Sequence, residues 1–466
     1  MWRRHGADSS PGCSWPAVTD DGELIRPEDP ETLSDDTEPE PDSGPGSATR
    51  PSMFRSLGVR NFRLFMMGQS VSVAGTWMQN VAVGWLTLEL GGSGGVLGTV
   101  IAARFAPLLI IGPWGGLVAD RHEKRRLLRM TASCQVVIAA VIGTLAVTHV
   151  ITVWSLAALI LLAGVVDVFD TPARQTFINN MVGIDRLSNA IALNSIVVNG
   201  ARIVGPALAG VLIAHVGVAP CFYANAGSYL AVIASLYFMR PEELHASRVE
   251  TRAAGQVRAG LRYVWHTPQL LVPLLLVAIT GAFAWEFQVT LPLFVGVFHG
   301  DSTTYGTTLA AVAVGSIAGG FLAARRHHVD LRVVAVSAVL WGVVIVAAAA
   351  APDLAVAYVL LALVGAGTVT FNSVSKTVLQ VESEDRMRGR VMALWSIGWQ
   401  GSTVIGAPAV GFIGQWLGGR YPLGFGGVTT LLAGAAILAL SRGYTRNALS
   451  VKTLRRSSSD RSAAST

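Results

Sequence analysis

Long apolar stretches follow one another from Phe62 onward and constrain the fold more than any other feature of the chain. Each is about 20 residues or longer, the length that an α-helix needs to cross the hydrocarbon core of a bilayer. Charged residues make up only 14% of the sequence, against about 25% in soluble domains. This excludes an ordinary soluble enzyme. The pattern predicts an all-α membrane protein with twelve transmembrane helices, at 62–90, 95–119, 126–148, 152–177, 189–214, 219–239, 268–298, 305–324, 331–351, 354–378, 391–416 and 421–441.

The remaining segments divide the chain. Residues 1–52 are acidic and rich in proline, and they hold too few aliphatic residues to bury a core, so they predict a disordered cytoplasmic tail. Residues 240–267 predict a cytoplasmic connecting loop with a short amphipathic helix on the membrane surface. Residues 442–466 predict a basic, serine-rich cytoplasmic tail. The two six-helix halves then occupy residues 53–239 and 268–441.

Basic residues fix the expected orientation. Loops on one side of the predicted membrane hold a single base, Arg420, whereas the bases outside the spans otherwise lie at the opposite face. Basic loops stay cytoplasmic, so both termini are expected inside and the protein is expected to be multi-pass in the plasma (inner) membrane. The net charge of +6 then reflects topology rather than a nucleic-acid partner. The three cysteines are widely separated and predict neither a disulfide framework nor a metal site.

An internal repeat predicts how the halves are related. Because the repeat covers six helices, an even number, the halves should run parallel, related by an axis along the membrane normal. The repeated glycines should also allow close helix packing, with Pro206 beside them. The matching positions, 201 residues apart, are Ala192-Leu193 with Ala393-Leu394, Ser195-Ile196 with Ser396-Ile397, Gly205 with Gly406, Gly210 with Gly411, and Gly217 with Gly418.

Two motifs resemble those of the major facilitator superfamily. The segment GLVADRHEKR at 116–125 resembles motif A, although Glu123 stands where glycine is usual, and GPALAG at 205–210 resembles the helix 5 motif of antiporters. The segments GTWMQNVAVGWLTLEL and DTPARQTFINNMV resemble the drug:proton antiporter branch, with its enterobactin-exporter-like and multidrug efflux proteins. The resemblance covers residues 54–441. It implies the major facilitator fold and a monomeric secondary transporter that exports amphipathic, drug- or siderophore-like small molecules by alternating access, driven by a proton gradient.

Motif A is expected to form a gate on the cytoplasmic side. Asp120 lies at the carboxyl end of its helix, where the helix dipole disfavours an anion, so it needs a cation or the amino terminus of another helix, such as the one that follows Arg390. That contact would latch the halves together, whereas the alternative is a solvated charged loop. The gating residues are Gly116, Asp120, Arg121, Lys124 and Arg125.

Charged side chains inside the spans are the proton-coupling candidates. Asp167, Asp170 and Arg174 share one helix face, and charges at this depth are costly unless they face water or each other. We expect Asp170 to pair with Arg174, which leaves Asp167 as the freer carboxylate. The alternative is that all three reach the cytoplasm.

Glu286 is the acid that lies well inside a span of the second half, and burial disfavours its charged form, as proton coupling requires. The alternative is a permanently protonated, structural Glu286. Arg104 and Arg202 are the matching cations. Arg104 is expected to form a structural pair, and Arg202 to neutralise Asp167 or Glu286 or to meet an anionic substrate.

Polar and aromatic side chains are candidates for a substrate cavity. The first helix has a polar stripe that either lines a cavity, which we favour, or bonds to a neighbouring helix. Aromatic rings, Trp77 among them, would supply an apolar wall, although each alone is more often part of the core or faces lipid. The cavity candidates are Gln69, Ser72, Thr76, Gln79, Trp285, Phe287, Phe371 and Asn372.

No motif predicts an enzyme or a bound cofactor. None of the three lysines follows a glycine, so a phosphate-binding loop is absent and ATP-driven transport by this chain is excluded. The alternatives to efflux are an importer or a lipid flippase on the same fold, or a membrane scaffold or sensor that does not transport. A scaffold would have little need for buried charges.

Overall fold

The computed structural model describes residues 55–244, 256–324 and 330–440, with the backbone alone for Asp120 and a few other helical residues. Every regular element in these ranges is helical. The predicted tails and most of the polar part of the connecting loop lie outside the described residues. The principal helices are α1 (Arg60–Glu89), α2 (Gly94–Arg121), α3 (Lys124–Val147), α4 (Val153–Val182), α5 (Ile184–Val216), α6 (Ala219–Tyr237), α7 (Gln256–Trp265), α8 (Pro268–Phe283), α9 (Phe287–Val297), α10 (Ser302–Ala324), α11 (Leu331–Ala349), α12 (Leu354–Val381), α13 (Asp385–Ser396), α14 (Thr403–Leu417) and a last helix at Tyr421–Leu440.

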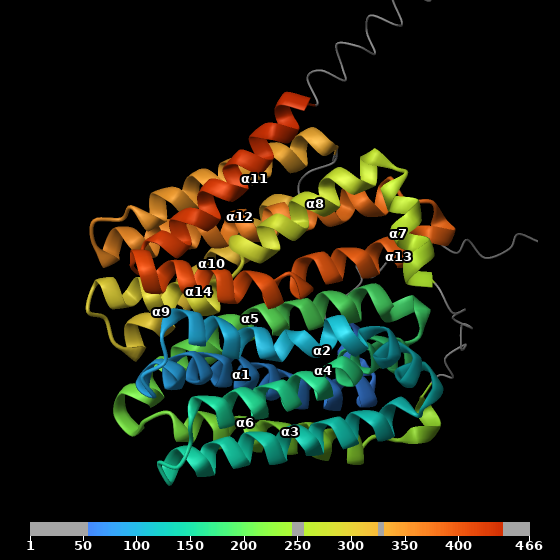
Figure 1. Ribbon diagram of the computed structural model, residues 1–466. Coiled ribbons are helices and arrows are strands. Elements are labelled where there is room, and N and C mark those ends of the chain that lie inside the picture. The colour runs from blue at the N-terminus through green and yellow to red at the C-terminus, as the bar shows by residue number, and fades with distance from the viewer. Residues whose placement is uncertain (1–54, 245–255, 325–329, 441–466) are drawn as a thin grey trace, which may run out of the picture. The chain divides into compact units, whose positions relative to one another are not determined.

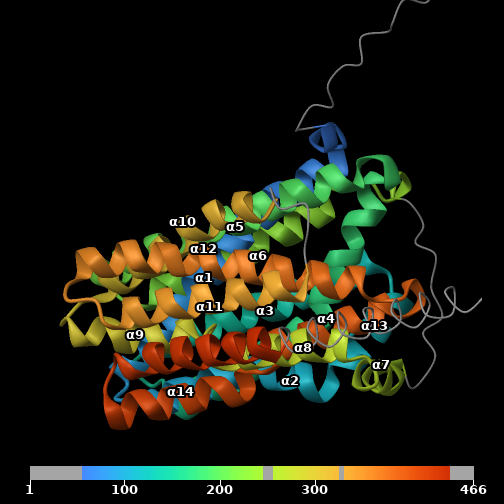
Figure 2. The ribbon, with the colours of Figure 1, turned by 90° about the horizontal axis from the view of Figure 1, so that it is seen from above.

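The helices from Met53 onward form two groups that meet along two seams. Helices α1 to α6 pack on one another, and so do the helices from α8 onward (Figure 1). One seam joins α2 to α14 and the other joins α5 to α10. Both pairs lie side by side in the two views (Figures 1 and 2). The grouping follows the two halves of the sequence repeat.

Eight of the described helices are long and apolar enough to cross a membrane, or nine if α7 and α8 are counted as one bent span. Helices α1 and α6 fall short because amides and hydroxyls such as Gln69, Gln79 and Asn225 lie among their apolar residues. The amphipathic helix predicted in the connecting loop is present as α7, which meets α8 at 106°.

Two helices predicted as continuous are interrupted. The predicted helix 268–298 divides at Glu286, because α8 ends at Phe283 and α9 begins at Phe287. The predicted helix 391–416 begins earlier, with α13, and contains a π-helical turn at Ile397–Gly401 before α14. Turns of this kind are frequent at functional sites.

The repeated glycines occupy equivalent contacts, which confirms their predicted packing role. A Cβ atom at Gly205 would lie 2.6 Å from the Ala74 carbonyl oxygen, and one at Gly406 would overlap the Ala282 carbonyl, so each glycine lets its helix approach the first helix of its own half. Gly210 approaches Ser302 on α10, and Gly411 approaches Gly94 on α2, across the two seams. The carbonyl oxygen of Pro206 likewise lies against Gly306. Gly217 and Gly418 end α5 and α14 with φ values of 92° and 107°, a conformation that favours glycine.

Candidate functional site

An ion pair between α2 and α4 lies at the centre of the first half. Arg104 donates from Nε to Asp167 Oδ2 at 3.0 Å and from a terminal nitrogen to the same oxygen at 2.9 Å. Gln135 of α3 donates to Asp167 Oδ1 at 2.9 Å, and Gly164 allows α2 and α4 to approach closely at this level. Asp167 is therefore paired, which corrects the expectation that it would be the freer carboxylate. The pairing expected of Arg104 is confirmed.

A second ion pair follows one turn further along α4. Arg174 Nε donates to Asp170 Oδ2 at 2.8 Å, the predicted contact between residues four apart. Thr131 of α3 donates to the other oxygen of Asp170 at 2.7 Å, and Arg174 also donates to Gln69 of α1. The two pairs therefore join all of the first four helices, and both carboxylates have several hydrogen-bond donors.

Two buried amides of the α1 polar stripe, Gln69 and Gln79, bond to neighbouring helices, so the preferred cavity-lining expectation is wrong for them. Gln69, Ser72 and Gln79 are no more than 5% exposed. Asn225 of α6 donates to Gln79 Oε1 at 2.7 Å, while the Thr76 hydroxyl lies 3.2 Å from that of Tyr229. A buried amide must find partners, and α4 and α6 supply them.

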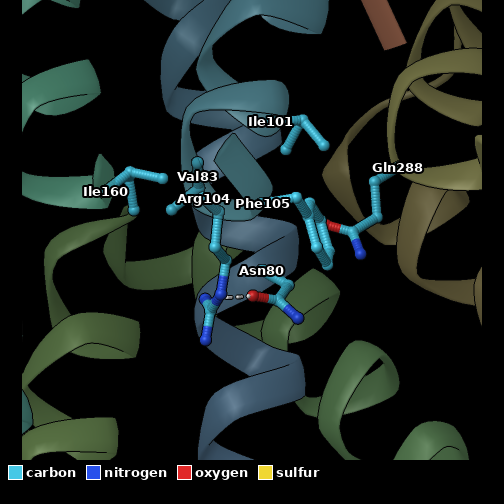
Figure 3. Close-up of a pocket in the computed structure, with 7 residues that line it drawn as sticks. All are labelled: Asn80, Val83, Ile101, Arg104, Phe105, Ile160 and Gln288. Carbon is cyan, nitrogen blue, oxygen red and sulfur yellow. Dashed lines mark hydrogen bonds between the residues drawn. The ribbon is translucent and has the colours of Figure 1, made fainter. Parts of the chain in front are cut away.

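A small pocket lies where α1, α2 and α4 of the first half meet α9 of the second (Figure 3). Arg104 enters it and donates to Asn80 Oδ1 at 3.0 Å, the dashed contact in Figure 3. Gln288 contributes a second amide from α9. The remaining lining residues are apolar: Val83, Ile101, Phe105 and Ile160.

Aromatic rings gather around the break in the second half. The Trp285 ring centroid lies 5.5 Å from that of Phe287 and 5.1 Å from that of Trp399, which stands in the π-helical turn. Phe371 stacks on Trp341 and approaches Trp399 at 6.4 Å. The structure therefore brings together three of the four rings predicted for an aromatic wall, whereas Trp77 lies against Arg202 on α5. Asn372 is the next residue of α12 after Phe371.

Glu286 lies within this cluster, directly before α9. Its side chain is 3% exposed. Thr403 of α14 donates a side-chain hydrogen bond to the carboxyl group, but Oε1 has no hydrogen-bond partner among the described residues. A buried polar atom without a partner is costly, so a proton or a ligand group would be stabilised at this oxygen.

Arg202 is, like Glu286, a charge inside the predicted spans for which the described residues show no ion pair. Its guanidinium carbon lies 5.3 Å from the centre of the Trp77 ring, and its Nε is buried without a hydrogen-bond partner. No acidic side chain of the described ranges forms an ion pair with it. The predicted pairing with Asp167 or Glu286 is therefore wrong, since Arg104 takes Asp167.

The cations of motif A bind within their own half. Lys124 donates to Asn180 at the end of α4, and Arg125 donates to the carbonyl oxygens of Leu236 and Tyr237 at the end of α6. Arg121 is exposed. The Asp120 side chain lies outside the described residues, so the predicted latch stays a prediction. Gly116 is buried.

Several residues of these networks escape sequence analysis, although Asn80 belongs to the polar stripe expected on the first helix. Thr131, Gln135 and Thr403 act across helix pairs, and only the repeat could have pointed to Thr403, as the counterpart of Arg202. Trp399 could have been noticed from the glycines on either side of it. Among the residues described, no cluster of three His, Cys, Asp or Glu side chains is placed to hold a metal ion.

Long apolar helices joined by partly buried ion pairs define a polytopic helical membrane protein. Residues 51–458 match the transmembrane secretion effector family. The chain belongs to this family of the major facilitator superfamily.

Relatives with established names are transporters. The chain is 23% identical over 344 residues to the staphyloferrin A transporter of Staphylococcus aureus, covering 71% of this chain and 84% of the relative. It is 28% identical over 363 residues to the multidrug efflux pump Tap of Mycolicibacterium fortuitum, covering 75% and 87%. Its fold matches a bacterial homologue of the lysosomal transporter Spinster, in an inward-facing and unoccupied conformation, with a TM-score of 0.68 at 14% identity, over 83% of this chain and 97% of the other.

These comparisons confirm the predicted superfamily and the resemblance to its multidrug efflux proteins. The protein is a multi-pass membrane transporter rather than an enzyme.

Proposed function

We propose that the protein exports amphipathic small molecules across the plasma membrane in exchange for protons. The single observation that carries the coupling is Glu286, a buried carboxyl group with one oxygen unpartnered, at a helix break and among aromatic rings. A carboxyl group in such a place can hold a proton in one state and release it in another. The multidrug efflux pump among the relatives supports the direction of transport.

Alternating access would supply the two states. The group formed by α1 to α6 and the group from α8 onward would rock against each other along the α2–α14 and α5–α10 seams, where glycines permit close sliding contact. Asp120 of motif A would latch the cytoplasmic side. The proposed topology has twelve spans in two parallel halves with both termini cytoplasmic, and the chain would act as a monomer without ATP or a bound cofactor.

Asp167 and Asp170 take a supporting role in this proposal. Each already has an arginine and a hydrogen-bond donor, so a proton would have to displace an established ion pair. We assign them to holding the first half together. The proton step is assigned to Glu286.

The test uses purified protein in liposomes with an imposed pH gradient. A lipophilic fluorescent drug is the transported probe, and Glu286→Gln mimics the protonated side chain. We expect the variant to lose gradient-driven accumulation and to keep gradient-free exchange of the probe. Asp353→Asn is the matched control, because Asp353 is an exposed carboxylate that caps α12, and it should transport normally.

Two outcomes would overturn the proposal. If the natural protein moves the probe equally well with and without the gradient, proton coupling is wrong. If Glu286→Gln retains gradient-driven accumulation, another group holds the proton. Reporter fusions in successive loops test the twelve-span topology separately.

A further inference from the structure

Arg202 and Glu286, two charges inside the predicted spans that form no ion pair with a described residue, lie at corresponding helix contacts of the two halves. Gly205 packs at Ala74 and Trp77, and its repeat counterpart Gly406 packs at Ala282. When the sequences are aligned so that Ala74 matches Ala282, Trp77 matches Trp285. The same repeat that relates Gly205 to Gly406 relates Arg202 to Thr403. Arg202 stands against Trp77, whereas Thr403 bonds Glu286, next to Trp285.

One residue from each of the two aligned segments lines the same pocket. The same alignment pairs Asn80 with Gln288, and these two amides line the pocket between α1, α2 and α9 (Figure 3). Asn80 uses its oxygen to accept from Arg104, so its Nδ2 group keeps its donors. The first half therefore contributes a cation, Arg202, and an amide donor, Asn80. The corresponding part of the second half contributes a carboxyl group, Glu286, and an amide, Gln288.

Of the arginines Arg104, Arg174 and Arg202 inside the spans of the first half, only Arg202 forms no ion pair with a described residue. Arg104 and Arg174 are each neutralised by an aspartate, and Arg202 is left with the face of Trp77 and a buried, unpartnered Nε. An aromatic face offsets only part of the cost of a desolvated cation. Buried charges in membrane proteins that lack a protein partner mark substrate paths.

We propose that Arg202, Trp77 and Asn80 form the subsite that recognises the anionic group of an organic anion, whose apolar body lies toward the aromatic rings. The guanidinium group neutralises a carboxylate or a similar anionic oxygen, the Asn80 amide donates to it, and the Trp77 ring covers it. This inference rests on the proposed transport function and names its substrate class. An organic cation would meet an uncompensated like charge at this position.

Equilibrium binding of three matched probes tests the charge preference without any gradient. Pyrenebutyrate, pyrenebutanol and pyrenebutylamine share one aromatic body and differ in charge, and energy transfer from tryptophan to pyrene reports their binding to the protein in nanodiscs. We expect the natural protein to bind the butyrate about tenfold more tightly than the alcohol, and the amine most weakly. Arg202→Thr, which introduces the residue found in the other half, should reduce the preference for butyrate over alcohol to about twofold or less, while Arg202→Lys should keep part of it.

Arg420→Gln is the matched control. Arg420 also stands over an aromatic ring, Phe298, but it lies in a loop and donates to the carbonyl oxygen of Ala351 at 2.7 Å. Its loss should leave the charge preference unchanged. Melting temperatures guard against misfolding: removal of an unpaired charge should not lower the value for Arg202→Thr, and pyrenebutyrate should raise the melting temperature of the natural protein only.

The binding assay and the transport assay test the anion subsite and the proton-coupled function separately. Equal affinity of the natural protein for all three probes, or an unchanged butyrate preference in Arg202→Thr, would overturn the anion subsite even if gradient-driven transport occurs. Preferential butyrate binding without gradient-driven transport would instead leave the subsite standing and refute the proton-coupled function.

Discussion

Removing one member of the Arg104–Asp167 pair should destabilise the protein strongly. The two side chains are 15% and 32% exposed and are joined by two contacts of 2.9–3.0 Å. Loss of one partner from a fully buried pair costs about 3–5 kcal/mol, because the other charge stays buried and uncompensated. Since Asp167 is about one-third exposed, solvent screens part of this effect. We therefore expect about 2 kcal/mol for Arg104→Gln and about the same for Asp167→Asn.

The double variant should cost less than the sum of the single changes, because it leaves two neutral side chains that can still hydrogen-bond. A coupling energy of about 1–2 kcal/mol is expected. Unfolding is followed by tryptophan fluorescence in dodecyl maltoside micelles titrated with dodecyl sulfate. The control cycle uses Arg386 and Glu384, a pair whose side chains are 83% and 50% exposed, where the coupling should stay below about 0.5 kcal/mol.

Additivity would refute the reasoning. If the costs of Arg104→Gln and Asp167→Asn sum within about 0.5 kcal/mol in the double variant, the two side chains do not depend on each other. The Arg104–Asp167 pair would then contribute little to the stability of the first half.

Two further predictions concern helix packing and capping. Gly411→Ala places a methyl group on the Gly94 carbonyl and should cost about 1–3 kcal/mol, whereas Gly389→Ala points into open space and should be near neutral; equal melting temperatures for the two variants would contradict the close seam. Hydrogen bonds from Thr304 lower the pKa of the Asp301 carboxyl group, so Asp301→Ala should cost about 1 kcal/mol near pH 7. A lowered pKa stabilises the fold above the unfolded-state value of about 4, so this cost should shrink as the pH falls below that value, and an equal cost in unfolding at pH 7 and pH 3 would contradict it.

Sequence patterns predict contacts within a helix better than contacts between helices. The Asp170–Arg174 pair follows from residue spacing, because residues four apart in a helix are neighbours. Asp167 meets Arg104 on another helix, 63 positions away, and no spacing rule identifies that partner. For the same reason, the polar stripe of α1 does not reveal from its spacing that its amides bond to α4 and α6.

The break at Glu286 could not have been read locally. Ala284, Trp285 and Glu286 include neither proline nor glycine, the usual signals for a helix end. The helices do separate there, with Trp285 packed on Trp399 and Glu286 bonded by Thr403. Tertiary contacts around the aromatic cluster therefore override helix propensity.

The duplicated glycines make the two seams resemble an isologous dimer interface in which the subunits have been fused. In a symmetric homodimer every substitution acts twice, so the two copies of a seam must always have equal strength. Here Gly411 meets Gly94 in one seam, while Gly210 meets Ser302 in the other. Because both halves belong to one chain, each seam can vary alone. A single methyl group can tighten or loosen one side of the molecule and leave its counterpart untouched, a freedom that a pair of identical subunits does not have.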